Sequence, residues 1–331
     1  MKDEYVKTGS SIMETALKFR ESALLLGAVK LDLFERIGPE FRSLDQLPGA
    51  EDPDGLRRLC RALASMDLLE KENDHFRNPE PIEELLTSRG KQDLRPILIH
   101  FIELYKMWAE LDDAILKGQS YEFDPGKNEL FDEMFTEAME ARARFSAEEL
   151  AEVLHNRIQW NTLLDLGGGS GIFARALLRK NPETTGIVAD QPGPLQVAQR
   201  YIESSNMEER LNTRTIDLLE DEQYGEQFDL VLLSAILHLF DSEDAQLILE
   251  RSHSALSRGG SVVVREYVVH NDHSGPLDAL LFDVLMYLAT EQGRIYTEHT
   301  LSRMLTKAGF QKIDRIELSR STDDLLIGTK K

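Results

Sequence analysis

Apolar side chains recur with two different periods along this chain, and the change of period divides it. Up to about residue 157 they recur every three to four positions, which predicts helices over 12–37, 54–66, 94–117 and 129–155. Gly38-Pro39 ends the first of these helices. Beyond residue 157, short apolar runs alternate with helical stretches, which is the pattern of a parallel sheet covered by helices.

Residues 1–92 have the pattern of a small helical domain with a two-stranded wing. Asp54 is the expected N-cap of the helix that runs to Met66. The remaining short elements, a capped helix and the two strands of the wing, are predicted over 43–47, 68–70 and 75–77. Their order resembles a winged-helix module, a shape common among DNA-binding domains. Residues 93–157 are expected to form a helical connector, with a turn-rich segment over 118–128.

Residues 158–331 predict an α/β domain with a Rossmann-like, mostly parallel sheet. The parallel strands are predicted over 163–166, 185–189, 213–216, 228–233 and 261–268. Helices are expected from Ile172 onward, over 242–256 and over 297–308. The last two strands, 311–318 and 323–329, are predicted to form an antiparallel hairpin.

Composition limits what this fold can bind. The 331 residues carry a formal net charge of −21, which repels nucleic acid and anionic membranes and favours small-molecule substrates. Cys60 is the only cysteine, so neither an intrachain disulfide nor a cysteine-cluster metal site is expected. The first residues lack a signal-peptide pattern and no apolar run reaches spanning length, which predicts a cytoplasmic location.

Three arginines leave a second class of function open. Arg57, Arg58 and Arg61 lie where a recognition helix would contact DNA, as in a ligand-sensing transcriptional regulator. Because acidic residues surround them in the sequence, we interpret these arginines as a solvated helix face.

The glycine-rich stretch after the first parallel strand carries the strongest chemical signal. A strand that runs through glycines into a helix brings unpaired backbone N–H groups to a ligand. The residues that fit D-x-G-x-G-x-G, the pattern of S-adenosylmethionine-dependent methyltransferases, are Asp165, Gly167, Gly169 and Gly171. Gly169, Gly171 and Ala174 also fit the dinucleotide pattern, so a nicotinamide-dependent dehydrogenase is the alternative. Asp165 favours the first pattern, since an acid suits a cationic aminoacyl group better than a pyrophosphate.

Two more carboxylates follow the next strands. Asp190 comes about 20 residues after the glycines, where a carboxylate accepts hydrogen bonds from a ribose diol. Asp217 follows the third strand and is expected near the adenine. Because parallel strands end at one edge of a sheet, Asp165, Asp190 and Asp217 are expected to face the same crevice.

His238 and Glu266 are the candidate catalytic pair. His238 lies just past the fourth strand and Glu266 near the end of the fifth, so adjacent strand ends bring both to the crevice. Methyl transfer to a phenol requires loss of a proton with an ordinary pKa near about 10, and histidine is a suitable base. A carboxylate behind the ring fixes its tautomer and stabilises the imidazolium. This scheme needs no metal, and no metal site is expected.

Together these motifs cover nearly the whole chain and resemble the metal-independent small-molecule O-methyltransferases, the family of plant caffeate and acetylserotonin enzymes and bacterial polyketide-tailoring enzymes. The resemblance implies S-adenosylmethionine as cofactor, S-adenosylhomocysteine as product, and a homodimer formed through the N-terminal domain. His238 falls on the family's base and Glu266 on its supporting glutamate. Residues at cofactor-binding positions are Asp165, Gly167, Gly169, Gly171, Asp190, Gln191, Asp217, Leu218 and Ser234. Residues at substrate-binding positions are Phe135, Met139, Asp283 and Met286.

Two positions depart from the family pattern, and both bear on the choice of acceptor and the support of the base more than on cofactor binding. Ser234 stands where the family has a lysine, and Ile295 stands where it often has a second glutamate beside the base. The sequence therefore predicts methyl transfer to a hydroxyl of a small, aromatic molecule. It leaves open methylation of carbon or nitrogen, and use of the cofactor without methyl transfer.

Overall fold

The computed structural model describes residues 2–47, 49, 52–118, 129–319 and 322–331. The chain divides into two compact units, Met1–Leu104 and Tyr105–Lys331. The predicted turn over 118–128 lies outside the described residues, apart from Gly118. The finer division into segments ending at residues 92 and 157 stays a prediction. Among the described residues, no helix has both the length and the apolar character needed to cross a membrane.

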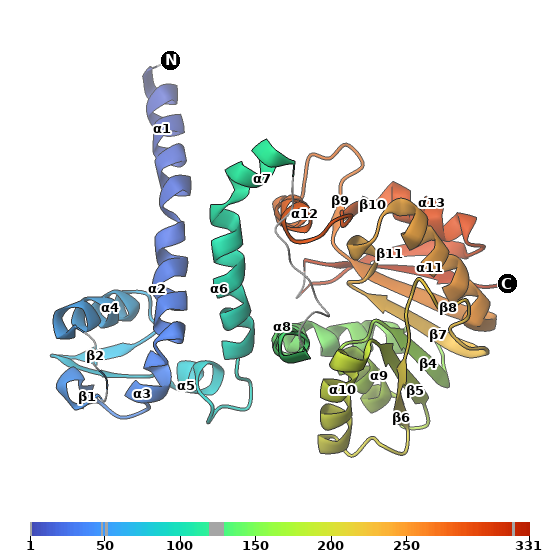
Figure 1. Ribbon diagram of the computed structural model, residues 1–331, viewed down its shortest axis with the longest axis horizontal. Coiled ribbons are helices and arrows are strands. Elements are labelled where there is room, and N and C mark those ends of the chain that lie inside the picture. Colours follow the sequence, from blue (N-terminus) through green and yellow to red (C-terminus); the bar gives the residue numbers. More distant parts are fainter. Residues whose placement is uncertain (1, 48, 50–51, 119–128, 320–321) are drawn as a thin grey trace. The chain divides into compact units, whose positions relative to one another are not determined.

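The first unit packs helices against a three-stranded antiparallel sheet (Figure 1). Its helices are α1 (Lys2–Leu17), α2 (Phe19–Lys30), α3 (Leu33–Ile37), the 3-10 helix η1 (Leu44–Gln46), α4 (Pro53–Ser65), α5 (Glu80–Leu86) and the first part of α6 (Arg95–Ala109). Its strands are β1 (Arg42–Ser43), β2 (Glu70–Glu72) and β3 (His75–Arg77), in the order β1-β3-β2. Phe34, Leu63 and Phe76 are fully buried at the centre of this unit.

The long helix expected over 12–37 was a wrong prediction. Three helices occupy this part of the chain, because Lys18 separates α1 from α2 and Asp32 adopts a left-handed conformation (φ 52°) before α3. The predicted end of the helical stretch is confirmed at Gly38, which has a positive φ of 73° after α3. Apolar periodicity alone does not reveal such a break, since the apolar face continues on both sides of it.

Helix α4 begins with a different cap from the one predicted. The side chain of Asp52, and not that of Asp54, accepts the N–H of Gly55 at 2.9 Å. Pro53 occupies the first helical position, where its missing N–H costs nothing. Ser43 was also expected to cap a helix, but its side chain makes no capping hydrogen bond and its backbone belongs to β1.

The second unit is an α/β domain around a seven-stranded sheet in the order β11-β12-β8-β7-β4-β5-β6. Its strands are β4 (Thr162–Leu166), β5 (Thr185–Asp190), β6 (Leu211–Thr215), β7 (Phe228–Ser234), β8 (Leu256–Glu266), β11 (Gln311–Glu317) and β12 (Asp324–Thr329). Strand β12 is antiparallel to both neighbours and the other neighbouring strands are parallel, which confirms the predicted sheet and its terminal hairpin. A two-stranded sheet joins β9 (Val268–Val269) and β10 (Tyr296–Thr297).

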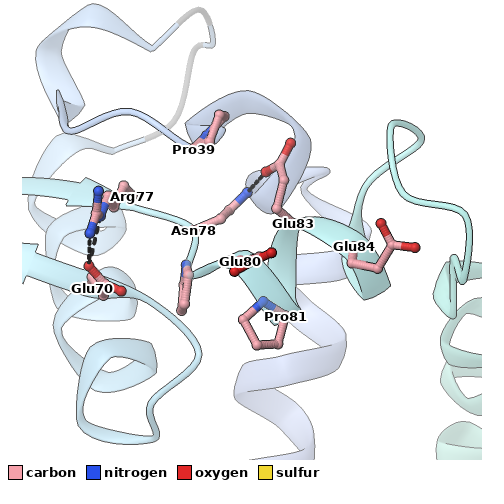
Figure 2. A pocket seen from close by; sticks show the side chains of 9 residues that line it. Pro39, Glu70, Arg77, Asn78, Glu80, Pro81, Glu83 and Glu84 are labelled. Carbon is pink, nitrogen blue, oxygen red and sulfur yellow. Dashed lines mark hydrogen bonds and ion pairs between the residues drawn. The ribbon is translucent and has the colours of Figure 1, made fainter.

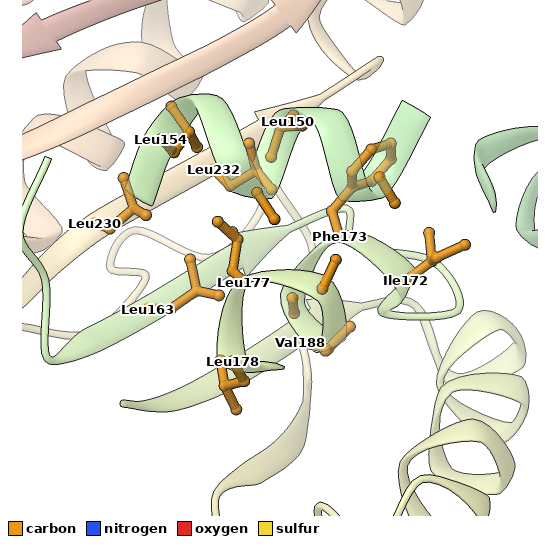
Figure 3. Packing of buried hydrophobic residues seen from close by; sticks show 14 of the residues in the cluster. Leu150, Leu154, Leu163, Ile172, Phe173, Leu177, Leu178, Val188, Leu230 and Leu232 are labelled. Atoms are coloured by element: carbon orange, nitrogen blue, oxygen red, sulfur yellow. The ribbon is translucent and has the colours of Figure 1, made fainter. Parts of the chain in front are cut away.

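Helices cover both faces of the seven-stranded sheet (Figure 1). On one face lie α8 (Glu129–His155), α9 (Ile172–Lys180) and α10 (Pro192–Ser204), and on the other α11 (Ser242–Ala255) and α13 (Glu298–Lys307). Figure 3 shows Leu163 of β4 and Leu230 of β7 beside Leu154 and Leu177 on the first face. The next residue of β4, Leu164, packs on the second face. Burial on both faces explains why these strands have continuous apolar sequences.

Some boundaries in this unit differ from the prediction. The helix expected over 94–117 is divided at Glu110 into α6 and α7 (Leu111–Lys117). Strand β6 ends at Thr215, so Asp217 lies in the turn that follows and not at the strand end. A cap consisting of α12 (Leu277–Ala289) and the following loop precedes β10, and a 3-10 helix, η2 (Leu237–Leu239), follows β7.

Candidate active site

The glycine-rich turn between β4 and α9 is packed on one side and open on the other. Gly167, Gly169 and Gly171 have φ angles of 64°, 56° and 72°, a region that other residues rarely adopt. A Cβ on Gly167 would lie 2.2 Å from Ile236, and one on Gly171 would lie 2.9 Å from Val188. A Cβ on Gly169 would meet no atom within 4 Å. The turn therefore presents bare backbone to open space at Gly169.

Asp190, at the end of β5, holds this turn from the neighbouring strand. One carboxylate oxygen accepts the N–H of Gly169 at 2.7 Å, and the other accepts the N–H of Gln191 at 2.7 Å. Burial raises the pKa of Asp190, and these two N–H groups offset part of the rise. Asp190 therefore lies beside the glycine-rich turn, and its expected contact with a ribose stays a prediction.

Asp165 does not face an open crevice, which corrects the expectation from its place in the motif. Its side chain is fully buried beneath Gly168, where an added Cβ would lie 2.8 Å from the carboxyl carbon. Neither carboxyl oxygen makes a hydrogen bond of ordinary geometry within the described chain. Burial raises the pKa of Asp165 to about 8, and the nearby charge of Asp190 adds to the rise. Asp165 therefore packs against the buried side of the glycine-rich turn.

Asp217 closes the turn that follows β6. Its Oδ1 accepts the N–H groups of Leu219 and Glu220 at 2.8 and 3.0 Å, and these bonds hold the pKa of Asp217 below its ordinary value. The side chain of Gln191 reaches from α10 to donate to the carbonyl of Ile216 at 3.1 Å. Leu218, in the same turn as Asp217, packs against the hydrophobic core on the second face of the sheet. The amide of Gln191 also lies 3.4 Å from Asp217, so Gln191 and Asp217 are neighbours, and their expected contact with the cofactor stays a prediction.

A buried ion pair that the sequence analysis missed also supports the glycine-rich turn. Glu140 of α8 accepts hydrogen bonds from Ser170 in the turn and from Arg175 of α9, both at 2.6 Å. The side chains of Glu140 and Arg175 are only 4% and 7% exposed. The signal that could have found them is Arg175 itself, since a charge within a wholly buried helical segment requires a partner.

His238 and Glu266 lie together, as predicted. His238 Nδ1 is 2.6 Å from one carboxylate oxygen of Glu266. The other oxygen accepts the N–H groups of Ile236 and Leu237 at 2.9 and 2.7 Å. Ala235, just before this turn, has a positive φ of 60°, so the chain bends sharply from β7 into η2. The imidazole is 6% exposed and the glutamate 2%, which screens the pair from bulk water.

An aromatic side chain lies beside His238, and a second aromatic side chain stacks on the first. The ring of Phe282, on α12, meets the imidazole edge-on at a centroid distance of 5.0 Å. Tyr267, the residue after Glu266, stacks on Phe282 at 4.3 Å. Neither ring was singled out from the sequence, because each lies in a stretch with many other apolar residues. A pair of aromatic rings therefore borders the base.

One hydrogen bond fastens the loop of the cap to α12, and another connects that loop to the turn that carries the base. Asp283 of α12 accepts the N–H of Ile295 at 2.8 Å, and the carbonyl of His238 accepts the N–H of Arg294 at 2.8 Å. Met286, the other candidate on α12, is buried against Ile295 and its neighbours. Phe135 and Met139, the candidates on α8, are half-buried. Their contact with an acceptor stays a prediction.

Comparison with known proteins decides the family. A family model described as an O-methyltransferase domain matches residues 108–311, more than half of the chain. This chain belongs to that O-methyltransferase family. It is an S-adenosylmethionine-dependent O-methyltransferase, and the expected fold, cofactor and reaction class are confirmed.

Three proteins illustrate the similarity. The chain is 27% identical to the tetracenomycin polyketide synthesis 8-O-methyl transferase TcmO of Streptomyces glaucescens, over 98% of each chain. It is 30% identical to a 3-amino-4-hydroxybenzoate 4-O-methyltransferase of Streptomyces cremeus, over 78% of this chain and 73% of the relative. Human N-acetylserotonin methyltransferase in complex with SAM has the same fold, with a TM-score of 0.82, 21% identity and coverage of 98% and 97%.

Ser234 of this O-methyltransferase faces a buried arginine. Its hydroxyl accepts a hydrogen bond from Arg265 at 3.2 Å, and the same guanidinium pairs with Asp323 and lies 4.7 Å above the ring of Phe173. Ser234 is therefore tied to the centre of the sheet, and its expected contact with the cofactor stays a prediction.

The first unit has a hollow of its own, of about 780 Å³, between β2, β3 and α5. Figure 2 shows Arg77 directed at Glu70 and Asn78 directed at Glu83 along its wall. No candidate catalytic or cofactor-binding residue lines it.

Proposed function

We propose that His238 of this methyltransferase removes a proton from the hydroxyl of a small aromatic acceptor while Glu266 orients the imidazole. The observation that carries this proposal is the 2.6 Å contact between Nδ1 and a buried carboxylate. An ionised carboxylate only accepts hydrogen bonds, so the neutral ring carries its proton on Nδ1. This leaves Nε2 free to accept the proton of a hydroxyl.

The cofactor fits the glycine-rich turn. Open space at Gly169 allows close approach to the backbone, and Asp190 supplies a carboxylate at the same strand end. We propose that Asp190 binds the ribose diol, that Gly167, Gly169 and Gly171 shape the turn around the amino acid portion, and that Asp217 and Leu218 border the adenine. Gln191 holds these two strand ends together. The cofactor supplies an electrophilic methyl group on a sulfonium.

The acceptor is proposed to be aromatic because of what surrounds the base. Phe282 and Tyr267 form a stacked pair next to His238, and aromatic faces favour aromatic ligands. Met139 and Met286 are proposed to border the same space, since methionine adapts to flat ligands. The relatives named for a hydroxybenzoate and a polyketide agree with an acceptor of this class.

Methyl transfer from labelled cofactor tests this function. The protein is incubated with S-adenosylmethionine carrying a deuterated methyl group and a panel of phenols, and products are analysed by mass spectrometry and NMR. We expect a product with the label on oxygen. A label found only on carbon or nitrogen, or none on any phenol, would contradict the proposal.

We further propose that the first unit is a winged-helix dimerisation domain of a cytoplasmic homodimer. Its antiparallel β1-β3-β2 sheet beside α4 suits that domain type. Apolar side chains are exposed on its first helix, among them Ile12 at 63% and Met13 at 59%, as on a surface covered by a second copy. The buried, free thiol of Cys60 suits a reducing compartment. Light scattering should give the mass of two chains, and a single-chain mass would contradict the dimer.

A further inference from the structure

Arg142 of α8 brings a guanidinium to the aromatic pair beside the base. Its central carbon lies 5.9 Å from the ring centre of Tyr267 and 6.0 Å from that of Phe282. One of its N–H groups donates to the hydroxyl of Tyr267. The Phe282 ring therefore lies near both groups, with its centre 5.0 Å from that of the His238 imidazole and 6.0 Å from the Arg142 guanidinium carbon.

Among the described residues, no carboxylate pairs with the charge of Arg142. The sequence has 59 acidic and 38 basic residues, and Arg175, in the same layer of helices, is held by Glu140. Arg142 is exposed, and within the described residues it forms no ion pair. Glu266, which precedes Tyr267 in the chain, is already engaged by His238 and by backbone N–H groups. The exposed guanidinium can therefore accept an anion that is not part of the described chain.

We propose that Arg142 binds a carboxylate on the aromatic acceptor, at the end of the molecule opposite to the hydroxyl that is methylated. This assignment rests on the proposed function, because it places the acceptor between His238 and Arg142. The guanidinium has five N–H groups in a planar fork that matches a carboxylate, and Tyr267 uses one of them. The hydroxyl of Tyr267 and the ring of Phe282 hold the guanidinium at the aromatic pair that borders the base.

The alternative role for Arg142 is to support Tyr267 without touching the acceptor. The two roles differ in what they predict for a charged and a neutral ligand of the same shape. If Arg142 binds the carboxylate, its loss should weaken binding of an acid but not of the methyl ester of that acid. If Arg142 only supports Tyr267, its loss should affect the binding of both ligands equally. Tyr267→Phe serves as the matched variant, since it removes the hydrogen bond to Arg142 and keeps both the ring and the charge.

The test is a fluorescence titration of the full-length protein saturated with S-adenosylhomocysteine. The probes are a naphthoate with its hydroxyl and carboxylate at opposite ends of the two rings, and the methyl ester of that acid. We expect Arg142→Gln to weaken binding of the acid by about ten-fold or more, as for loss of one charge-assisted pair, and to leave the ester within about two-fold. Arg142→Lys should recover part of the loss, and Tyr267→Phe should change both probes to a similar, small extent.

Three results would overturn the inference: equal weakening of both probes by Arg142→Gln, equal binding of acid and ester to the wild-type protein, or no binding of either. The titration reports binding and requires no turnover. Selective binding of the acid through Arg142 by a protein that methylates no phenol would leave this site standing and reject the proposed function alone.

Discussion

The carboxylate of Glu266 contacts both the imidazole ring of His238 and the backbone of the turn that carries it. One carboxylate oxygen lies 2.6 Å from Nδ1 of the imidazole, and the other accepts the N–H of Leu237 at 2.7 Å and, more weakly, that of His238 at 3.4 Å. A single side chain thus shapes the turn after β7 and orients the base within it. Loss of its charge is expected to affect both stability and catalysis.

Glu266→Gln tests this double role. In glutamine one oxygen can still accept the backbone N–H groups, but the NH2 group then donates to Nδ1, which places the ring proton on Nε2 and removes the base. We expect kcat to fall by about ten-fold or more, and the free energy of unfolding to fall by about 1–3 kcal/mol because hydrogen bonds to a charged group are lost. Steady-state kinetics and urea unfolding measure the two effects. Wild-type kcat in a stably folded variant would show that Glu266 does not orient the base.

Gly167→Ala and Gly169→Ala form a matched pair for the cofactor site. Both positions have a left-handed backbone, so each variant is expected to lose about 1–2 kcal/mol from that strain. The new Cβ at position 167 also collides with Ile236, whereas the one at 169 projects into open space. Gly169→Ala should therefore weaken S-adenosylmethionine binding by calorimetry, and Gly167→Ala should lose more stability by urea unfolding. Unchanged cofactor affinity in the Gly169 variant would place the cofactor elsewhere.

The buried pair between Glu140 and Arg175 gives a prediction about stability. Glu140→Gln leaves the guanidinium of Arg175 buried without an opposite charge, which costs about 3–5 kcal/mol in comparable cases. Ser170→Ala removes only the hydroxyl that Glu140 accepts and should cost about 1 kcal/mol. Urea unfolding of the two variants measures the difference. Equal, small losses would mean that the ion pair contributes little.

Asp165 makes the stability of the cofactor-free protein depend on pH. Its carboxyl ionises near about 4 in an unfolded chain, and burial raises the pKa to about 8 in the folded protein. Between these values the unfolded state binds fewer protons, so ionisation of Asp165 lowers the free energy of unfolding as the pH rises. Asp165→Asn removes this contribution. Urea unfolding between about pH 5 and 8 should therefore show a shallower decline in the variant than in the wild type, and parallel curves would contradict it.

Much of the fold could be predicted from the sequence, because local patterns and global structure agree. Leu163, Leu164 and Leu166 are apolar without alternation, and β4 is buried on both faces as that pattern requires. The pairing of His238 with Glu266 also followed from their positions at the ends of neighbouring parallel strands. In the second case the sheet topology brings together two residues that are distant in sequence.

Other features depend on three-dimensional packing that no local pattern reveals. Asp165 was expected to face a ligand because of its motif, but the tight turn at Gly168 covers its carboxyl. Arg142 and Tyr267 meet across 125 positions of the chain, so no spacing predicts their contact. The choice of Asp52 over Asp54 as a cap depends on which residue takes an extended conformation, and both have the same side chain.

The most direct test of the central claim is methyl transfer by His238→Ala, measured with the labelled cofactor and paired with calorimetry of cofactor binding. The imidazole lies apart from the glycine-rich turn in the sequence and serves only the acceptor in this account. We predict that the variant binds S-adenosylmethionine as the wild type does and methylates a phenol about 100-fold more slowly or worse. Turnover at the wild-type rate, with cofactor affinity unchanged, would show that the proton leaves by another route.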